Sequence, residues 1–198
     1  HGSRGLGDVY KRQILFLSII SSVILLNFSL LTVLGTLLLI ATLLINNKKI
    51  YPYFYGSSFT LLNIEIFNTL NLNIFDFFLN YLFPISLVSG VFSSMMIGHW
   101  FLVDPTISKE GMKKIAITST FQSLILTPLV FFEFIGQDIE SIFKNVILIL
   151  FLSTSILSFA SYKSLGEKSY TGVMASTGLS YLSLIVSLGA SGGLLLLS

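Results

Sequence analysis

His99 has the widest range of possible chemistry in this sequence, because it is the only histidine apart from His1. An imidazole inside a membrane helix can move a proton, bind a quinone carbonyl or ligate haem. Haem bound through His99 would need a methionine as its second axial ligand, and methionines stand at positions 95, 96, 112 and 174. We favour a simpler interpretation, in which His99 hydrogen-bonds to other helices or to lipid headgroups beside Trp100.

A polar pocket could form around His99. Gln122, in the next predicted helix, is expected at a similar membrane depth. Asn63 and Asn68 fall on one side of a helix when each residue adds 100°. These four side chains are the predicted binding pocket. Ordinary hydrogen bonding between helices would account for the same residues.

Glu65 and Asp104 complete the set of candidate binding residues. A carboxylate at membrane depth often binds a proton or a cation, and Glu65 qualifies only if its helix crosses the membrane. Asp104 and His99 are the nearest acid–imidazole pair, but five-residue spacing does not place them on one helical face. We predict no catalytic residue and no metal site. The sequence has no cysteine, nucleophile elbow, phosphate loop or zinc-binding motif.

The last apolar segment carries small residues at four-residue spacing, which lets helices approach each other closely. We interpret these residues as helix-packing positions rather than active-site serines. They are Gly172, Ser176 and Ser180, followed by Gly189 and Gly193.

The segments that hold these residues are long and apolar. Only 10% of the residues are charged, against about a quarter in a typical soluble domain. We therefore predict an all-α, multi-pass helical bundle with six or seven transmembrane helices in a single domain, residues 14–198. The predicted spans are residues 14–45, as one tilted helix or a hairpin of two, then 51–73, 79–103, 115–135, 143–162 and 171–197.

Two segments carry alternatives. Residues 51–73 are rich in asparagine and could instead lie in the membrane interface. Residues 1–13 share no character with the rest of the chain and resemble translated adapter sequence from an assembly. We predict that they are a non-native leader, although a short basic N-terminus is the alternative.

We predict that the chain lies in the inner membrane of the cell. The positions of its lysines predict which loops face the cytoplasm. They gather in three loops, around residues 48–49, 109–114 and 163–168, whereas Asp76, Asp138 and Glu140 occupy loops between them. The positive-inside rule places the lysine loops in the cytoplasm and the C-terminus outside. The three loops share one side only if residues 51–73 cross the membrane, and Lys144 lies on the other side.

Three classes of function remain. The first is a non-enzymatic membrane subunit or anchor of a larger complex, such as a redox complex, with the lipid bilayer and other membrane subunits as partners. The second is a small transporter or channel that uses the polar pocket. The third is a membrane enzyme acting on a lipid or quinone. A net charge of +2 gives no reason to expect nucleic acid as a partner.

Overall fold

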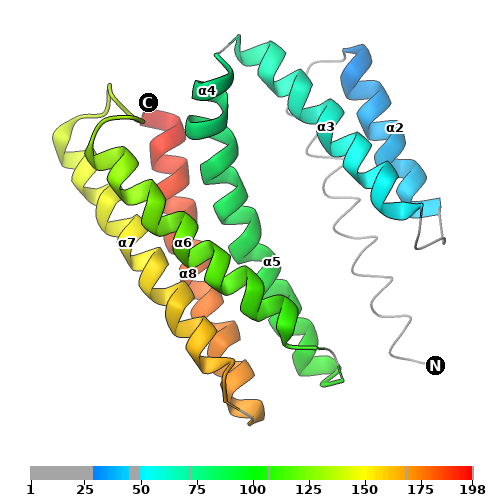
Figure 1. Ribbon diagram of the computed structural model, residues 1–198, viewed down its shortest axis with the longest axis vertical. Coiled ribbons are helices and arrows are strands. Elements are labelled where there is room, and N and C mark those ends of the chain that lie inside the picture. Colours follow the sequence, from blue (N-terminus) through cyan, green and yellow to red (C-terminus); the bar gives the residue numbers. More distant parts are fainter. Residues whose placement is uncertain (1–28, 45–49, 72, 107, 168, 198) are drawn as a thin grey trace. The chain divides into compact units, whose positions relative to one another are not determined.

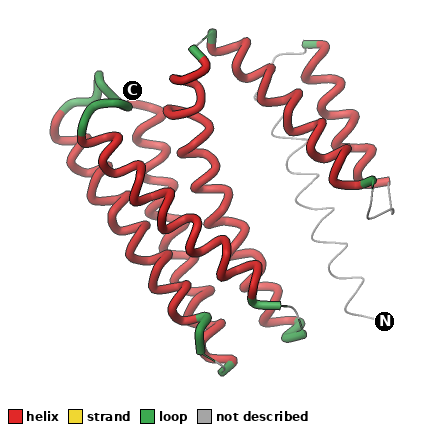
Figure 2. The backbone as a smooth tube through the Cα atoms, viewed as in Figure 1, coloured by secondary structure: helices red, strands yellow, loops and turns green. Residues whose placement is uncertain are grey.

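The computed structural model describes residues 29–44, 50–71, 73–106, 108–167 and 169–197, and all regular structure within them is helical (Figure 1; Figure 2). These residues fall into two compact units, one ending at Ile74 and the other beginning at Phe75. The first unit contains α2 and α3, and the second contains α5 to α8. The predicted all-α class is confirmed for the described residues.

The first unit is a pair of packed helices, α2 (Leu30–Leu44) and α3 (Tyr51–Leu70). Helix α2 begins directly after Ser29, whose Oγ accepts a hydrogen bond from the Thr32 backbone N–H at 3.2 Å. This helix lies within the predicted 14–45 span, and the choice between one tilted helix and a hairpin of two stays a prediction. The leader 1–13 and the first part of that span lie outside the described residues.

The second unit begins within one long helical segment, whose first residue, Ile74, is the last of the first unit. This segment consists of α4 (Ile74–Asp76), the π-helical turn η1 (Phe77–Leu82) and α5 (Phe83–Val103). In η1 the Phe83 N–H bonds to the Phe78 carbonyl, five residues back. Pro84 follows immediately and has no N–H to continue an α-helical ladder. The segment therefore starts five residues before the predicted residue 79 and passes through a π turn that the prediction did not include.

Three further helices follow, α6 (Glu110–Phe131), α7 (Ser141–Ser164) and α8 (Tyr170–Leu197). The α6 boundaries differ most from the predicted 115–135. Helix α6 ends at Phe131, and left-handed backbone at Glu133 (φ 60°) and Gly136 (φ 68°) then turns the chain toward α7. The predicted bounds of α7 and α8 are within two residues of the observed ones.

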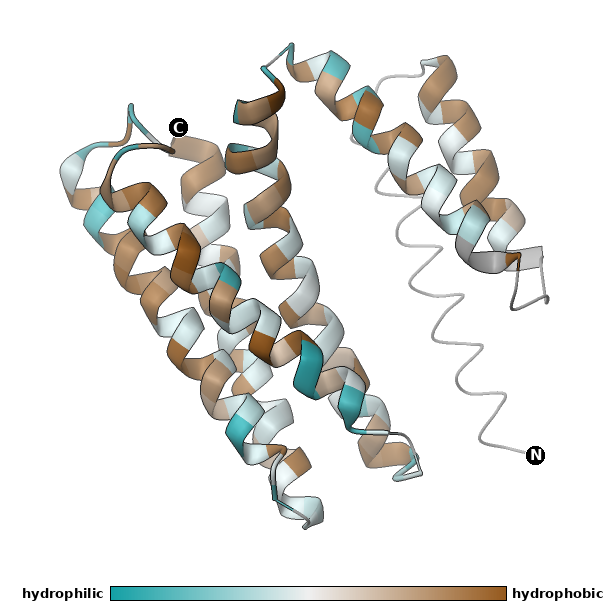
Figure 3. Ribbon diagram, viewed as in Figure 1, coloured by the Kyte–Doolittle hydropathy of each residue, from teal (hydrophilic) through white to brown (hydrophobic). Residues whose placement is uncertain are grey.

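Four helices among the described residues are long and apolar enough to cross a membrane, namely Ile74–Val103, Glu110–Phe131, Ser141–Ser164 and Tyr170–Leu197. Figure 3 shows apolar colouring over much of these four helices. Helix α2 is apolar but shorter, and α3 is not among the four. The four helices indicate a membrane location and fit a membrane helical bundle, but the predicted count of six or seven spans is not confirmed.

The four long helices pack side by side around two apolar clusters (Figure 1). The larger cluster lies beside the α6–α7 turn and includes Leu87, Leu126, Phe151 and Leu194. The smaller cluster lies at the other end of the bundle and contains Phe101, Met112, Leu165 and Val173. Between the clusters, the interior is lined by serines.

Candidate functional site

Helices α7 and α8 are joined by hydroxyl groups. The Ser161 hydroxyl bonds to that of Ser176 at 2.7 Å and to that of Ser180 at 3.3 Å. The hydroxyls of Ser158 and Ser183 are 3.0 Å apart. All five serines are buried, so their polar groups are satisfied between helices rather than by solvent.

The other helix pairs are linked by serines that donate to backbone carbonyls. Ser123 Oγ donates to the Phe151 carbonyl at 2.6 Å, which joins α6 to α7. Ser191 Oγ donates to the Pro84 carbonyl at 3.3 Å, which joins α8 to α5. Pro84 has no N–H for the carbonyl four residues back, so the bond from Ser191 to the carbonyl of Pro84 itself is an additional contact between α8 and α5.

A small cavity of about 10 Å³ lies among these serines, at the centre of the second unit. All four long helices contribute to its lining. The lining residues are Val91 and Ser94 from α5, Ala116 and Ser119 from α6, Ser158 and Ser161 from α7, and Ser180 and Ser183 from α8. We call this cavity the serine chamber. Ser94 and Ser119 were not among the predicted residues, because nothing in the sequence indicates which faces of α5 and α6 meet.

A much larger hollow of about 690 Å³, the α5–α6 groove, lies between those two helices. Lys114, Thr118 and Gln122 line it at four-residue spacing, and therefore from one face of α6. Gln122 Nε2 donates to the Phe83 carbonyl at 2.8 Å and to Ser86 Oγ. The remaining lining residues are Gly90, Ile115, Ser119, Phe121 and Ile125. Lys114 was missed in the sequence, although its spacing from Thr118 and Gln122 was visible there.

Gln122 and His99 lie at different levels along α5, whereas the sequence led us to expect them at a similar membrane depth. Gln122 contacts Phe83 and Ser86 near the start of α5. His99 lies 13 positions after Ser86 on the same helix, which is about 20 Å along its axis. Helices α5 and α6 run antiparallel, so a residue late in α5 meets the beginning of α6, not its middle.

His99 itself is exposed on α5. Its neighbour Gly98 is buried and faces the bundle interior, where Met112 and Thr177 pack against it. Met112 is fully buried, so the described structure does not place it beside His99 as a second haem ligand. Haem binding through His99 stays a prediction. Among the described residues, no group of three or more His, Cys, Asp or Glu side chains could hold a metal ion.

Asp104 shapes the turn between α5 and α6. Its backbone is extended (φ −130°, ψ 91°), and its Oδ1 accepts hydrogen bonds from the Thr106 N–H at 3.1 Å and from the Thr106 hydroxyl at 2.6 Å. These contacts form an Asx-type turn that ends α5. In this structure the carboxylate is held by the turn, not by His99.

The remaining pocket candidates belong to α3, in the first unit. Glu65 is buried, with 7% of its surface exposed, on the same face as Ser58 and Leu62. That face packs on α2, because Ser58 Oγ donates to the Gly35 carbonyl at 2.8 Å. Asn63 Nδ2 donates to the Phe59 carbonyl of its own helix at 2.8 Å, and Asn68 is exposed. The pocket that would join these residues to His99 stays a prediction.

The predicted packing residues all lie on α8. Ser176 and Ser180 bond to Ser161 as described, and Gly172 is buried where a Cβ would meet the Ser164 carbonyl oxygen at 2.6 Å. Gly193 leaves ordinary contact distance to Ile147, and Gly189 to Leu150. The α7 helix therefore lies against α8 at each of these glycines.

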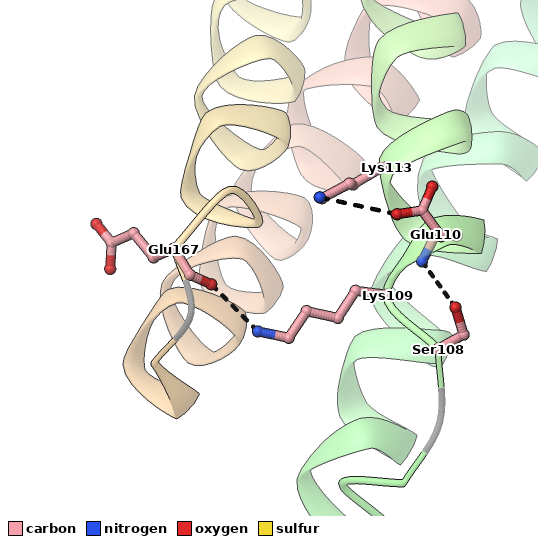
Figure 4. Close-up of polar contacts among 5 residues, drawn as sticks. All are labelled: Ser108, Lys109, Glu110, Lys113 and Glu167. Atoms are coloured by element: carbon pink, nitrogen blue, oxygen red, sulfur yellow. Dashed lines mark hydrogen bonds and ion pairs between the residues drawn. The ribbon is translucent and has the colours of Figure 1, made fainter.

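One end of the second unit carries a polar cluster that joins two turns (Figure 4). Lys109 Nζ donates to the Glu167 carbonyl at 3.2 Å, which links the α5–α6 turn to the α7–α8 turn. Glu110 lies 3.9 Å from Lys113, and its backbone N–H donates to Ser108 Oγ at 3.3 Å. The second and third lysine loops therefore lie at one end of this unit.

The opposite end carries an ion pair between Glu133 and Lys144, with Nζ and Oε1 2.6 Å apart. The hydrogen bond from Lys144, and then its positive charge, lower the pKa of the Glu133 carboxyl below its ordinary 4.5. Lys144, which breaks the predicted pattern of lysine loops, thus has an acidic partner in its own turn region.

No family model, curated protein or solved structure matches the chain.

Proposed function

We propose that this chain is a non-enzymatic subunit or anchor of a larger membrane complex, and that its α5–α6 groove binds a transmembrane helix of another polypeptide. The observation that carries the proposal is the groove, a hollow of about 690 Å³ with polar groups on its walls. Lys114, Thr118, Phe121 and Ile125 line the groove, and the two apolar side chains among them are exposed.

The depth of Gln122 supports a protein partner. Gln122 lies 12 residues after Glu110, the first residue of α6, and so about 18 Å along the helix. A hydrocarbon core of about 30 Å puts this amide near the middle of the membrane. Polar side chains at that depth are costly against lipid chains and usually face other helices.

The floor of the groove supports close approach of a helix. Gly90 and Ser86 of α5 and Ser119 of α6 are small, and small residues allow helix backbones to pack closely in membranes. Phe121 and Ile125 stand on the α6 wall, 58% and 50% exposed, where they can pack against a partner's apolar side chains. The proposed partner is therefore an apolar helix with small residues at its centre.

A bound phospholipid is the main competing occupant. Its phosphate could bind Lys114, which lies near the start of α6. Gln122 Nε2 already donates to α5. The acyl chains, however, offer no donor to the Gln122 side-chain oxygen and no hydrogen-bonding group to Thr118 deeper in the groove. A helix supplies both an apolar surface and side-chain hydroxyls or amides at that depth. We therefore favour the helix.

A photocrosslinking amino acid tests the proposal in the cells that make the protein. The probe replaces Phe121 in the groove or, as the control, Phe143, which is 48% exposed on α7. We expect the Phe121 probe to give one discrete adduct with a second polypeptide and the Phe143 probe to give none. Adducts with lipid alone, or within a single chain, would contradict the proposal.

A matched pair of variants then tests whether the partner binds in the groove. Ser86 and Ser93 are both serines of α5 that bond to carbonyls of their own helix, but only Ser86 lines the groove. Ser86→Trp should remove most of the adduct, because the indole occupies the groove. Ser93→Trp should leave it unchanged. Equal effects of the two variants would show that the partner binds elsewhere.

A further inference from the structure

The serine chamber is a polar site enclosed between two apolar clusters. Along α8, Val173 belongs to one cluster, Ser180 and Ser183 line the chamber, and Leu194 belongs to the other cluster. Six of the eight lining residues are serines, and none is charged. Serines are common between membrane helices, where they allow close approach and hydrogen-bond across the interface. Most serines of the chamber have such a role, because Ser158, Ser161, Ser180 and Ser183 are hydrogen-bonded between α7 and α8.

Ser94 is the residue that points to a ligand. It lines the chamber, it is 3% exposed, and its Oγ has no hydrogen-bond partner among the described residues. The neighbouring serines of α5 behave differently, because Ser89 and Ser93 donate to the carbonyls of Ile85 and Ser89, at 2.9 and 2.7 Å. A buried hydroxyl without a partner is unfavourable, and the usual remedy is an ordered water molecule.

The neighbours of Ser94 in the chamber retain capacity to bind. When the hydroxyls of Ser158 and Ser183 share one hydrogen bond, only one of their two hydrogens is used, and the other can donate elsewhere. Oxygen lone pairs on both remain available as acceptors. The lining thus offers donors and acceptors from more than one helix to a small neutral ligand.

The size of the chamber identifies that ligand. Its volume of about 10 Å³ is close to the roughly 10–15 Å³ that one water molecule needs, together with two to four polar partners. A metal cation of similar size would be bound by uncharged hydroxyls alone, without the carboxylates or carbonyl rings that compensate for its lost hydration. We propose that the serine chamber binds one water molecule, which links Ser94 of α5 to the serines of α7 and α8.

Removing the Ser94 hydroxyl tests whether the chamber holds water, because the change in stability should have a different sign in a chamber with water and in one without. If water is bound, Ser94→Ala takes away one of its partners, and the ratio of folded to unfolded protein should fall roughly five-fold. If the chamber is dry, the same change removes an unsatisfied hydroxyl, and the ratio should stay or rise. Reversible unfolding of the full chain in detergent measures the ratio.

The control variant is Ser187→Ala. Ser187 is fully buried on α8, lies outside the chamber and donates to the Leu184 carbonyl of its own helix at 3.0 Å. It loses the same oxygen atom and a hydrogen bond within its own helix, but no group of the chamber, so it measures the cost of removing a buried serine hydroxyl elsewhere in the bundle. A loss in Ser94→Ala no larger than that in Ser187→Ala would overturn the proposal.

Nuclear magnetic resonance gives a direct and independent test. Magnetisation transfer from water should reach the backbone amide of Ser94 in the full chain, in deuterated detergent, and should disappear in Ser94→Ala. No transfer to Ser94 would overturn the proposal whatever the stability data show. A stability that rises with sodium or potassium, but not with choline at equal ionic strength, would assign the chamber to a cation and would also overturn it.

Discussion

Glu133 combines two features that are individually uncommon, a left-handed backbone (φ 60°) and a short ion pair with Lys144. The pair lowers the pKa of Glu133. A lowered pKa in the folded state means that the pair stabilises the fold above the ordinary pKa of 4.5, and that this contribution is lost as the pH falls through the folded-state value. We expect Glu133→Gln to lower the melting temperature slightly at about pH 7 and to have almost no effect once the pH is below the lowered pKa of Glu133 in the folded state.

Melting curves of both proteins across that pH range check this prediction. Glu133 is 64% exposed in its side chain, so salt should weaken the pair. A difference between wild type and Glu133→Gln that is unchanged at high salt and low pH would show that the variant acts through the backbone turn instead.

At the scale of the elements, α5 packs tightly against α6 and α8 at Gly98. A Cβ there would lie 2.8 Å from Met112 Cε and closer still to Thr177 Oγ1, which is itself bonded to the Val173 carbonyl at 2.8 Å. We expect Gly98→Ala to destabilise the second unit by roughly 1–3 kcal/mol through overpacking. Reversible unfolding in detergent measures the change.

Gly178 provides the matched control for this prediction. It also lies inside a helix, α8, but a Cβ there would meet nothing within 4 Å. Gly178→Ala should be neutral or stabilising by up to about 1 kcal/mol, because alanine favours a helix more than glycine does. Similar losses in both variants would mean that α8 does not pack on α5 as described.

At the scale of the whole molecule, the second unit has two distinct ends, because its four long helices alternate in direction. The Lys109–Glu167 bond puts the α5–α6 and α7–α8 turns at one end, and Asp138 lies in the turn at the other. Since the chain has no cysteine, each introduced cysteine reports one position. Ser108→Cys and Glu167→Cys should react with an impermeant thiol reagent from the same side, and Asp138→Cys from the opposite side.

The lysine content of the first end predicts that this side is cytoplasmic. In intact cells the reagent should therefore label Asp138→Cys and spare the other two until the membrane is opened. Labelling of Ser108→Cys and Glu167→Cys from different sides would contradict the alternating arrangement. Labelling of both from outside would contradict only the predicted orientation.

Much of the helical architecture could be predicted from apolar runs alone, because a bilayer requires long uninterrupted helices. The bounds of α6 could not, because its end depends on left-handed backbone at Glu133 and Gly136. The α5–α6 groove and the serine chamber depend on how the helices pair along their length. The sequence does not show this pairing, so we expected Gln122 at the depth of His99. In the structure Gln122 lies beside Ser86 instead.

The hydrogen bonds of α6 also have an order in time, since a membrane protein is synthesised from its N-terminus. The Gln122 amide donates to the carbonyl of Phe83 and the hydroxyl of Ser86. Both acceptors are synthesised before α6. The carbonyl of Phe151, which receives the Ser123 hydroxyl, is made after it. Helix α6 is the least apolar of the four long helices, and the acceptors for Gln122, in its middle, have thus already been synthesised when that helix leaves the ribosome.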